Sequence, residues 1–169
     1  MRGLFIGRFQ PFHNGHLAVL KEMVKENDSI IIAVGSAQFS NTEKNPLTAG
    51  ERLVIITHIL RNLKVREFYI VPIEDVGNDN LWAFKLQQLL PQFDSVYTNN
   101  PLTKKILVRN GFKVKTPGLV KRSELSGTKI RERIKGGKSW RHQVPQIVIN
   151  DLIDFGLVER ITSVSNEFK

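Results

Sequence analysis

The sequence predicts an α/β fold, a doubly wound parallel sheet with helices on both of its faces. Short apolar runs rich in Ile and Val alternate with segments of helical periodicity along most of the chain. Strands with uninterrupted apolar sequence are buried on both faces, as is typical of parallel sheets. Right-handed crossovers would join such strands, and ligands would bind beyond their carboxyl ends.

The elements follow from local signals in chain order. Pro11 forbids a helix through the first turn, so the first helix opens at about Gly15. Thr48 and Glu51 form a capping box at the start of the second helix. Asn110-Gly111 and Gly136-Gly137 are typical of helix C-termini. We expect strands at 3–7, 29–35, 68–73 and 95–98, helices at 15–26, 49–63, 80–90, 102–110, 127–136 and 143–155, and a frayed tail over 163–169.

The length and composition of the chain limit its number of domains, its location and its chemistry. Its 169 residues are 41% hydrophobic, enough for one core, so we expect a single domain over 1–169 with a C-terminal helical segment from about 127. There is no signal segment and no apolar run near the length of a membrane span, so a cytoplasmic location is expected. The absence of cysteine excludes disulfides, thiol catalysis and thiolate metal sites.

Positive charge is concentrated in one part of the chain. The formal net charge is +9, and residues 101–142 hold 13 Lys or Arg against Glu124 and Glu132. Such a segment is either a solvated basic face or a surface that binds polyanions, with nucleic acid or a nucleotide as the ligand. The sequence has no RRM, KH or zinc-finger signature and few aromatic residues among the basic ones, so no specific nucleic acid is expected.

The stretch from Gly7 to His16 sets two histidines and two glycines between the first strand and the first helix. A helix N-terminus offers unpaired N–H groups and a favourable dipole to an anion, and His13 and His16 add imidazole donors at the same end. Gly15 leaves room for a nucleotide near the backbone. A metal cluster is not expected, because His58 and His142 lack ligand-like spacing to this pair; these two, with Trp140, are interpreted as structural.

These motifs resemble the HxGH nucleotidyltransferases, enzymes with a Rossmann-like fold that join a nucleoside triphosphate to a phosphate group and release pyrophosphate. The segment Leu125 to Arg131 resembles the second signature of that superfamily, a Ser/Thr-rich loop opening a helix with a phosphate-binding arginine. One branch is closer still, the archaeal-type nicotinamide mononucleotide (NMN) adenylyltransferases. Its motifs occur in order as GRFQPFH at 7–13, GSAQ at 35–38, PLTAGER at 46–52, LW at 81–82, NPL at 100–102 and SGT at 126–128.

The resemblance implies roles on the ATP side. His16 would bind the α-phosphate and the charge of the transition state, and His13 the neighbouring phosphates. Arg131 and Lys44 would hold the leaving β- and γ-phosphates, with lysine at 44 where many relatives have arginine. Phe9 and Phe12 are expected to pack the first turn. The remaining ATP-binding candidates are Gly7, Arg8, Phe9, Gln10, Gly15, Asn100, Ser126, Gly127 and Thr128, and Asn99 stands where relatives have glycine.

The resemblance also implies an acceptor pocket. Trp82 would stack on the pyridine ring, whose positive charge its face attracts, although a core tryptophan is the alternative. Asp75 and Val76 would approach the amide and ribose, and Asp79 stands where relatives have asparagine. Ser36 and Gln38 complete the NMN-binding candidates.

The implied activity is the reaction of ATP with NMN to give NAD and pyrophosphate, with Mg²⁺ carried on ATP and no metal bound by a protein cage. Nicotinate mononucleotide, phosphopantetheine and FMN remain alternative acceptors. A non-catalytic nucleotide- or nucleic-acid-binding module is the alternative from another class. The resemblance further suggests a homo-oligomer, with assemblies such as hexamers, and no membrane partner.

Overall fold

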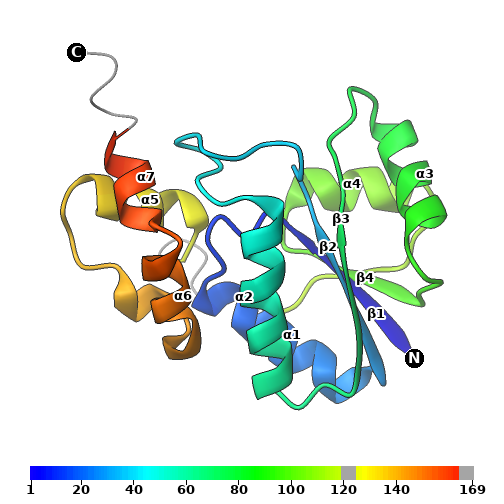
Figure 1. The fold of residues 1–169 in the computed structure, drawn as a ribbon. Helices are drawn as coiled ribbons and strands as arrows, with labels where there is room; N and C mark the ends of the chain where they lie inside the picture. Colours follow the sequence, from blue (N-terminus) through cyan, green and yellow to red (C-terminus); the bar gives the residue numbers. More distant parts are fainter. Residues whose placement is uncertain (119–124, 164–169) are drawn as a thin grey trace.

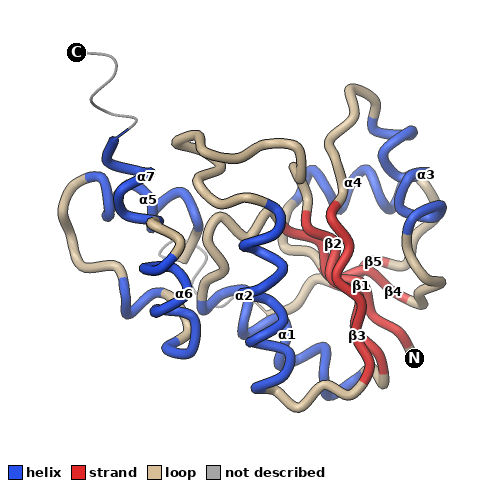
Figure 2. Tube along the Cα trace, viewed as in Figure 1, coloured by secondary structure: helices blue, strands red, loops and turns tan. Residues whose placement is uncertain are grey.

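The computed structural model describes residues 1–118 and 125–163, and its centre is a five-stranded parallel sheet (Figure 2). The strands are β1 (Arg2–Gly7), β2 (Ser29–Val34), β3 (Glu67–Pro72), β4 (Ser95–Tyr97) and β5 (Val114–Lys115). They lie in the order β3-β2-β1-β4-β5, so the winding reverses between β1 and β4. The predicted doubly wound parallel sheet is confirmed. The edge strand β5 was not predicted, because a strand of two residues is too short to show an apolar run.

Helices cover both faces of the sheet (Figure 1). The chain forms α1 (Asn14–Glu26), α2 (Ala49–Asn62), α3 (Asp79–Leu89), α4 (Pro101–Arg109) and α5 (Gly127–Lys135). Alternate residues of β2 divide between two apolar clusters, since successive side chains point to opposite faces. Ile30 and Ile32 join the cluster with α1 and α2, whereas Ile31 and Ala33 join the one with α3 and α4.

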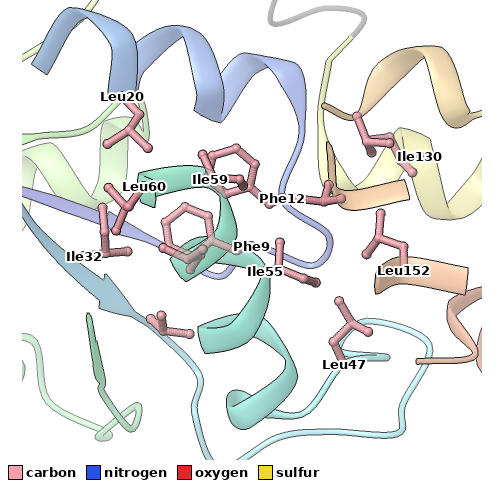
Figure 3. Packing of buried hydrophobic residues seen from close by; sticks show 14 of the residues in the cluster. Phe9, Phe12, Leu20, Ile32, Leu47, Ile55, Ile59, Leu60, Ile130 and Leu152 are labelled. Atoms are coloured by element: carbon pink, nitrogen blue, oxygen red, sulfur yellow. The ribbon is translucent and has the colours of Figure 1, made fainter. Parts of the chain in front are cut away.

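The C-terminal helices extend the first of these clusters beyond the sheet. Ile130 and Ile134 of α5 and Leu152 share one core with Leu47 and Ile55 beside and within α2 (Figure 3). This packing places the N-terminus of α5 next to the loop that follows β1. The loop after β1 and the loop before α5 therefore meet, although more than a hundred residues separate them in the sequence.

The predicted helix over 143–155 is wrong in its first half. Pro145 has no N–H for a helical bond, and the chain instead forms two short 3₁₀ turns, η1 (Arg141–Gln143) and η2 (Gln146–Val148), before α6 (Ile149–Asp154). Gly156, at φ +67°, ends α6, and an unpredicted helix α7 (Leu157–Ser163) follows. Residues 164–169 of the expected frayed tail, and 119–124 of the basic segment, lie outside the described residues.

Candidate active site

A cavity of about 610 Å³ lies where the carboxyl ends of β1, β2 and β4 meet the start of α5. This is the reversal point of the sheet, where open α/β sheets bind ligands. Most of the predicted site residues line it: Gly7, Arg8, Phe9, Gln10, His13, Gly15, His16, Ser36, Asp75, Trp82, Asn100, Ser126, Gly127, Thr128 and Arg131. Lys44, Gln38, Val76 and Asp79 are not among the residues that line it.

The two histidines cap helix α1 reciprocally. Nδ1 of His13 accepts a hydrogen bond from the backbone N–H of His16, and Nδ1 of His16 accepts one from the N–H of His13, both at 3.3 Å. Because each Nδ1 accepts, the proton of each neutral ring is on Nε2. The rings stack with their centroids 3.6 Å apart. Both imidazoles can therefore offer an Nε2–H donor to a ligand in the cavity.

Both rings are held in the neutral form. Burial lowers the pKa of His13 to about 4. Burial, and then the neighbouring His13, lowers the pKa of His16 well below its usual value. The aromatic rings of Phe5, Phe9 and Phe12 surround His16, with centroids 4.8 to 5.9 Å from its own. At neutral pH these groups are hydrogen-bond donors and not cations.

Glycines in the first loop make room for side chains of the loop itself. A Cβ on Gly15 would lie 3.0 Å from the ring of His13, so this glycine makes room for the histidine. The room that it leaves for a nucleotide stays a prediction. A Cβ on Gly7 would lie 2.8 Å from the ring of Phe9. The side chain of Phe9 is 1% exposed and lies in the core with Phe12 (Figure 3). Of the predicted ATP contacts, Phe9 can thus supply only its backbone.

Gln10 is also occupied by the fold. Its side-chain amide donates to the carbonyl of Leu47 and accepts from the N–H of Leu47, at 2.7 and 2.9 Å. The side chain is 3% exposed, so it ties two loops together and cannot flank a phosphate as predicted. Its backbone carbonyl accepts a 2.7 Å hydrogen bond from Nη1 of Arg131. Gly127 allows this approach, since a Cβ there would lie 2.8 Å from the same carbonyl oxygen.

The cationic groups gather at one end of the cavity. Arg131 is 8% exposed, and its Nη2 donates to Oγ1 of Thr128 at the start of α5. Burial, and then Arg8, lowers the pKa of Arg131. Arg8 itself is exposed at the mouth of the cavity. Lys44 is exposed on the neighbouring 42–45 turn, outside the lining, so the structure gives its predicted phosphate contact no support.

Asp75 and Trp82 add an acidic and an aromatic side chain to the lining of the cavity. Asp75 is the only acidic side chain among the described residues that line the cavity. Its Oδ2 accepts from Oγ of Ser36 at 2.6 Å, and the Gln38 side chain bonds its backbone N–H and C=O, each at 3.0 Å. Trp82 lines the cavity and also packs against the core cluster of α3 and α4. Its packing role is therefore observed, and its contact with a pyridine ring stays a prediction.

Besides Gln38, two acceptor-side candidates are not among the residues that line the cavity. Asp79 is the first residue of α3 and is exposed, while Asn78 caps that helix by accepting from the N–H groups of Asn80 and Leu81. Val76 is partly buried but does not line the cavity. Asn100 likewise uses its side-chain oxygen to cap α4. Sequence reasoning missed Thr98, which lines the cavity without a motif signal. It gave no role to Leu125, which begins the second signature and also lines the cavity, or to Arg52.

Within residues 1–118 and 125–163, no three His, Asp or Glu side chains gather closely enough to hold a metal ion. In the same part of the chain, no helix is long and apolar enough to cross a membrane.

Sequence comparison identifies a matching family model and full-length relatives. Residues 4–133 match the cytidylyltransferase-like family. A protein of Thermoplasma volcanium named nicotinamide-nucleotide adenylyltransferase is 46% identical over 97% of this chain and 92% of its own length. A protein of the same name from Picrophilus torridus is 46% identical over 98% of both chains.

Comparison with solved structures supports the fold. A bifunctional NMN adenylyltransferase/ADP ribose pyrophosphatase from Francisella tularensis superimposes with a TM-score of 0.81 at 18% identity. The match covers 98% of this chain and 53% of that one, so this chain spans about half of the larger protein.

Proposed function

Because the chain belongs to the cytidylyltransferase-like family, and within it to the nicotinamide-nucleotide adenylyltransferases, we propose that its cavity transfers the adenylyl group of ATP to NMN, giving NAD and pyrophosphate. The proteins of that name match this chain over nearly its full length. The roles proposed for the individual residues follow from the geometry of the site.

The charges that line the cavity carry the proposal. One group of features favours anionic oxygens: Arg8, Arg131, the His13–His16 pair and the N-termini of α1 and α5. A second group, the Asp75 carboxylate and the Trp82 ring, favours a cationic aromatic ring. A triphosphate on the first group and a pyridinium mononucleotide on the second would bring their phosphates together near the histidines.

The reaction needs alignment and charge stabilisation more than proton transfer. An oxygen of the NMN phosphate attacks the α-phosphorus of ATP and forms a new P–O bond, while the bond to the β-phosphate oxygen breaks and pyrophosphate leaves with its electron pair. The attacking phosphomonoester is already anionic near neutral pH, so no strong base is required. Nε2–H of His16 would donate to the α-phosphate as charge develops there, and Arg131 would hold the leaving phosphates.

We propose that Mg²⁺ enters as part of the substrate, bound to the triphosphate. The cationic end of the cavity has no carboxylate among its described lining residues, and hard divalent cations prefer oxygen ligands such as phosphate and water. The chain's own residues then bind the phosphate oxygens that the ion leaves free.

The acceptor end also bears on the alternative acceptors. Phosphopantetheine has no aromatic ring to stack on Trp82. Nicotinate mononucleotide carries a ring carboxylate, which Asp75 would repel, so we expect it to be the weaker substrate. FMN carries a larger, neutral ring that would gain nothing from the carboxylate.

The test is incubation of the purified protein with ATP and Mg²⁺ against NMN, nicotinate mononucleotide, phosphopantetheine and FMN, with mass detection of products. We expect NAD as the major product and pyrophosphate in equal amount. The absence of any adenylylated product, together with tight binding of long nucleic acid that weakens steeply with salt, would favour the non-catalytic alternative.

We also propose a homo-oligomer. Leu81 and Phe84 of α3 and Val108 of α4 are exposed apolar side chains on two helices that contact each other, and clustered exposed apolar groups are typical of protein contacts. Sedimentation velocity gives the number of subunits directly.

A further inference from the structure

Arg52 is a fully buried cation that the reaction described above does not use. It lies in the first turn and a half of α2 and is 0% exposed. Within residues 1–118 and 125–163, no carboxylate lies within ion-pairing distance of its guanidinium. Burial, and then Arg8, lowers the pKa of Arg52 to about 10, which leaves it charged at neutral pH. Burying a charge costs free energy unless hydrogen bonds or an opposite charge compensate it.

The guanidinium is satisfied by backbone carbonyls. Its Nε donates to the carbonyl of Thr48 at 3.1 Å, its Nη1 to those of Arg8 and Gly35 at 2.9 and 2.8 Å, and its Nη2 to that of Ser36 at 3.3 Å. One planar side chain therefore joins the start of α2 to the ends of β1 and β2. Only the fork of arginine can direct donors to all of these acceptors at once.

The two loops that Arg52 holds both line the cavity, the first through Arg8 and the second through Gly35 and Ser36. Both turn through a non-glycine residue in the left-handed region, Phe9 at φ 52° and Ser36 at φ 51°. Such conformations are unfavourable and persist where surrounding contacts fix them. The carbonyls of Arg8 and Ser36 are among those contacts.

We propose that Arg52 is a positioning residue for adenylyl transfer, which fixes the ATP-side loop and the acceptor-side loop relative to each other. On the first loop it holds the backbone of Arg8, which lines the cavity where the triphosphate is proposed to bind. On the second it holds Ser36, whose hydroxyl orients the Asp75 carboxylate. In-line attack depends on the relative placement of two substrates, so loss of this link lowers kcat more than it weakens either substrate.

The test compares Arg52→Ala and Arg52→Lys with Arg61→Ala, a control that removes an exposed arginine from the same helix. We expect both Arg52 variants to lose about 100-fold in kcat, with KM for ATP and for NMN changed less than about threefold, because misplacement affects the aligned state more than binding. Added guanidinium chloride at about 20 mM should restore part of the rate of Arg52→Ala, whereas methylammonium, with the same charge but no fork, should not.

The inference rests on the proposed function, and the wild-type protein in the same assay separates the two. A wild type that makes no NAD contradicts the function. A wild type that turns over, with a folded Arg52→Lys of equal kcat, overturns only the role of Arg52. If Arg52→Ala fails to fold, Arg52→Lys decides alone: a loss of kcat at an unchanged melting temperature supports the proposal, and a rate equal to that of the wild type contradicts it.

Discussion

At the scale of single residues, the His13–His16 pair shows how one contact serves both folding and chemistry. Each ring caps the helix through Nδ1, and this same bond fixes the tautomer that leaves Nε2–H available to phosphate. The motif predicts both histidines at the site, but the sequence does not show that they cap each other. Gly15 follows from this pairing, because the ring of His13 occupies the space of its missing Cβ.

The first prediction concerns His16. Replacing His16 with Ala should lower kcat by at least about 100-fold while ATP still binds, because a donor that strengthens as charge develops stabilises mainly the transition state. Steady-state kinetics and ATP binding by calorimetry measure the two effects. Circular dichroism is needed alongside, since the variant also loses half of the capping box. A folded variant with wild-type kcat would remove His16 from the reaction.

The second prediction concerns Trp82. Trp82→Ala should weaken NMN by about 1–2 kcal/mol, the size of one ring–cation contact, and leave KM for ATP nearly unchanged, with partial rescue by Phe. Phe84→Ala is the matched control, because Phe84 is 55% exposed on the same helix and does not line the cavity. An equal loss for both substrates would mean that Trp82 acts only through its packing on the core cluster of α3 and α4.

At the scale of elements, local signals predict starts and ends of helices where the decisive contact is near in sequence. The Thr48–Glu51 capping box at α2 is confirmed, with Glu51 N–H donating to Thr48 and Thr48 N–H donating to Glu51. The division of 143–155 was missed because apolar periodicity continues across Pro145, and α7 was missed because its anchor is distant. The predicted phosphate contacts of Gln10 and Lys44 depend in the same way on loops that are distant in the chain.

The third prediction tests the anchor of α7. Arg160 makes two 2.7 Å bonds to the Glu51 carboxylate and a third to the carbonyl of Pro46, at a partly buried position. Arg160→Met should lower the free energy of unfolding by about 1–3 kcal/mol, because it leaves a carboxylate without its bidentate partner. Lys135→Met, which breaks the exposed pair with Glu43, should cost less than about 0.5 kcal/mol. Urea unfolding compares them, and equal costs would contradict the assignment.

At the scale of the whole molecule, the sequence predicts the alternation of strands and helices, and chain connectivity rules then give the parallel sheet. The position of the cavity follows from the reversal between β1 and β4, which fixes where the motif loops meet. The role of Arg52 could not be predicted in this way. Its role depends on three backbone carbonyls near the ends of two strands. The direction in which a backbone carbonyl points cannot be read from the sequence.

The last prediction follows from burying two neutral histidines in one folded unit. In the unfolded chain an imidazole takes up a proton below about pH 6.5, whereas His13 in the folded protein does so only near pH 4. Acid therefore favours the unfolded state, and the stability that this group contributes is present above pH 6.5 and is lost as the pH falls toward 4. The shift corresponds to about 3 kcal/mol for His13, and His16 shifts in the same direction.

His13→Asn isolates this effect, since asparagine can still cap the helix but cannot titrate. We expect the free energy of unfolding of the wild type to fall more steeply than that of His13→Asn between pH 6.5 and 4. Above pH 6.5 the two free energies should have the same dependence on pH. His142→Asn, at an exposed position, is the control for losing a histidine as such. Parallel curves for the wild type and His13→Asn would show that the pKa of His13 is the same in the folded and the unfolded protein, which would contradict the lowering of this pKa by burial.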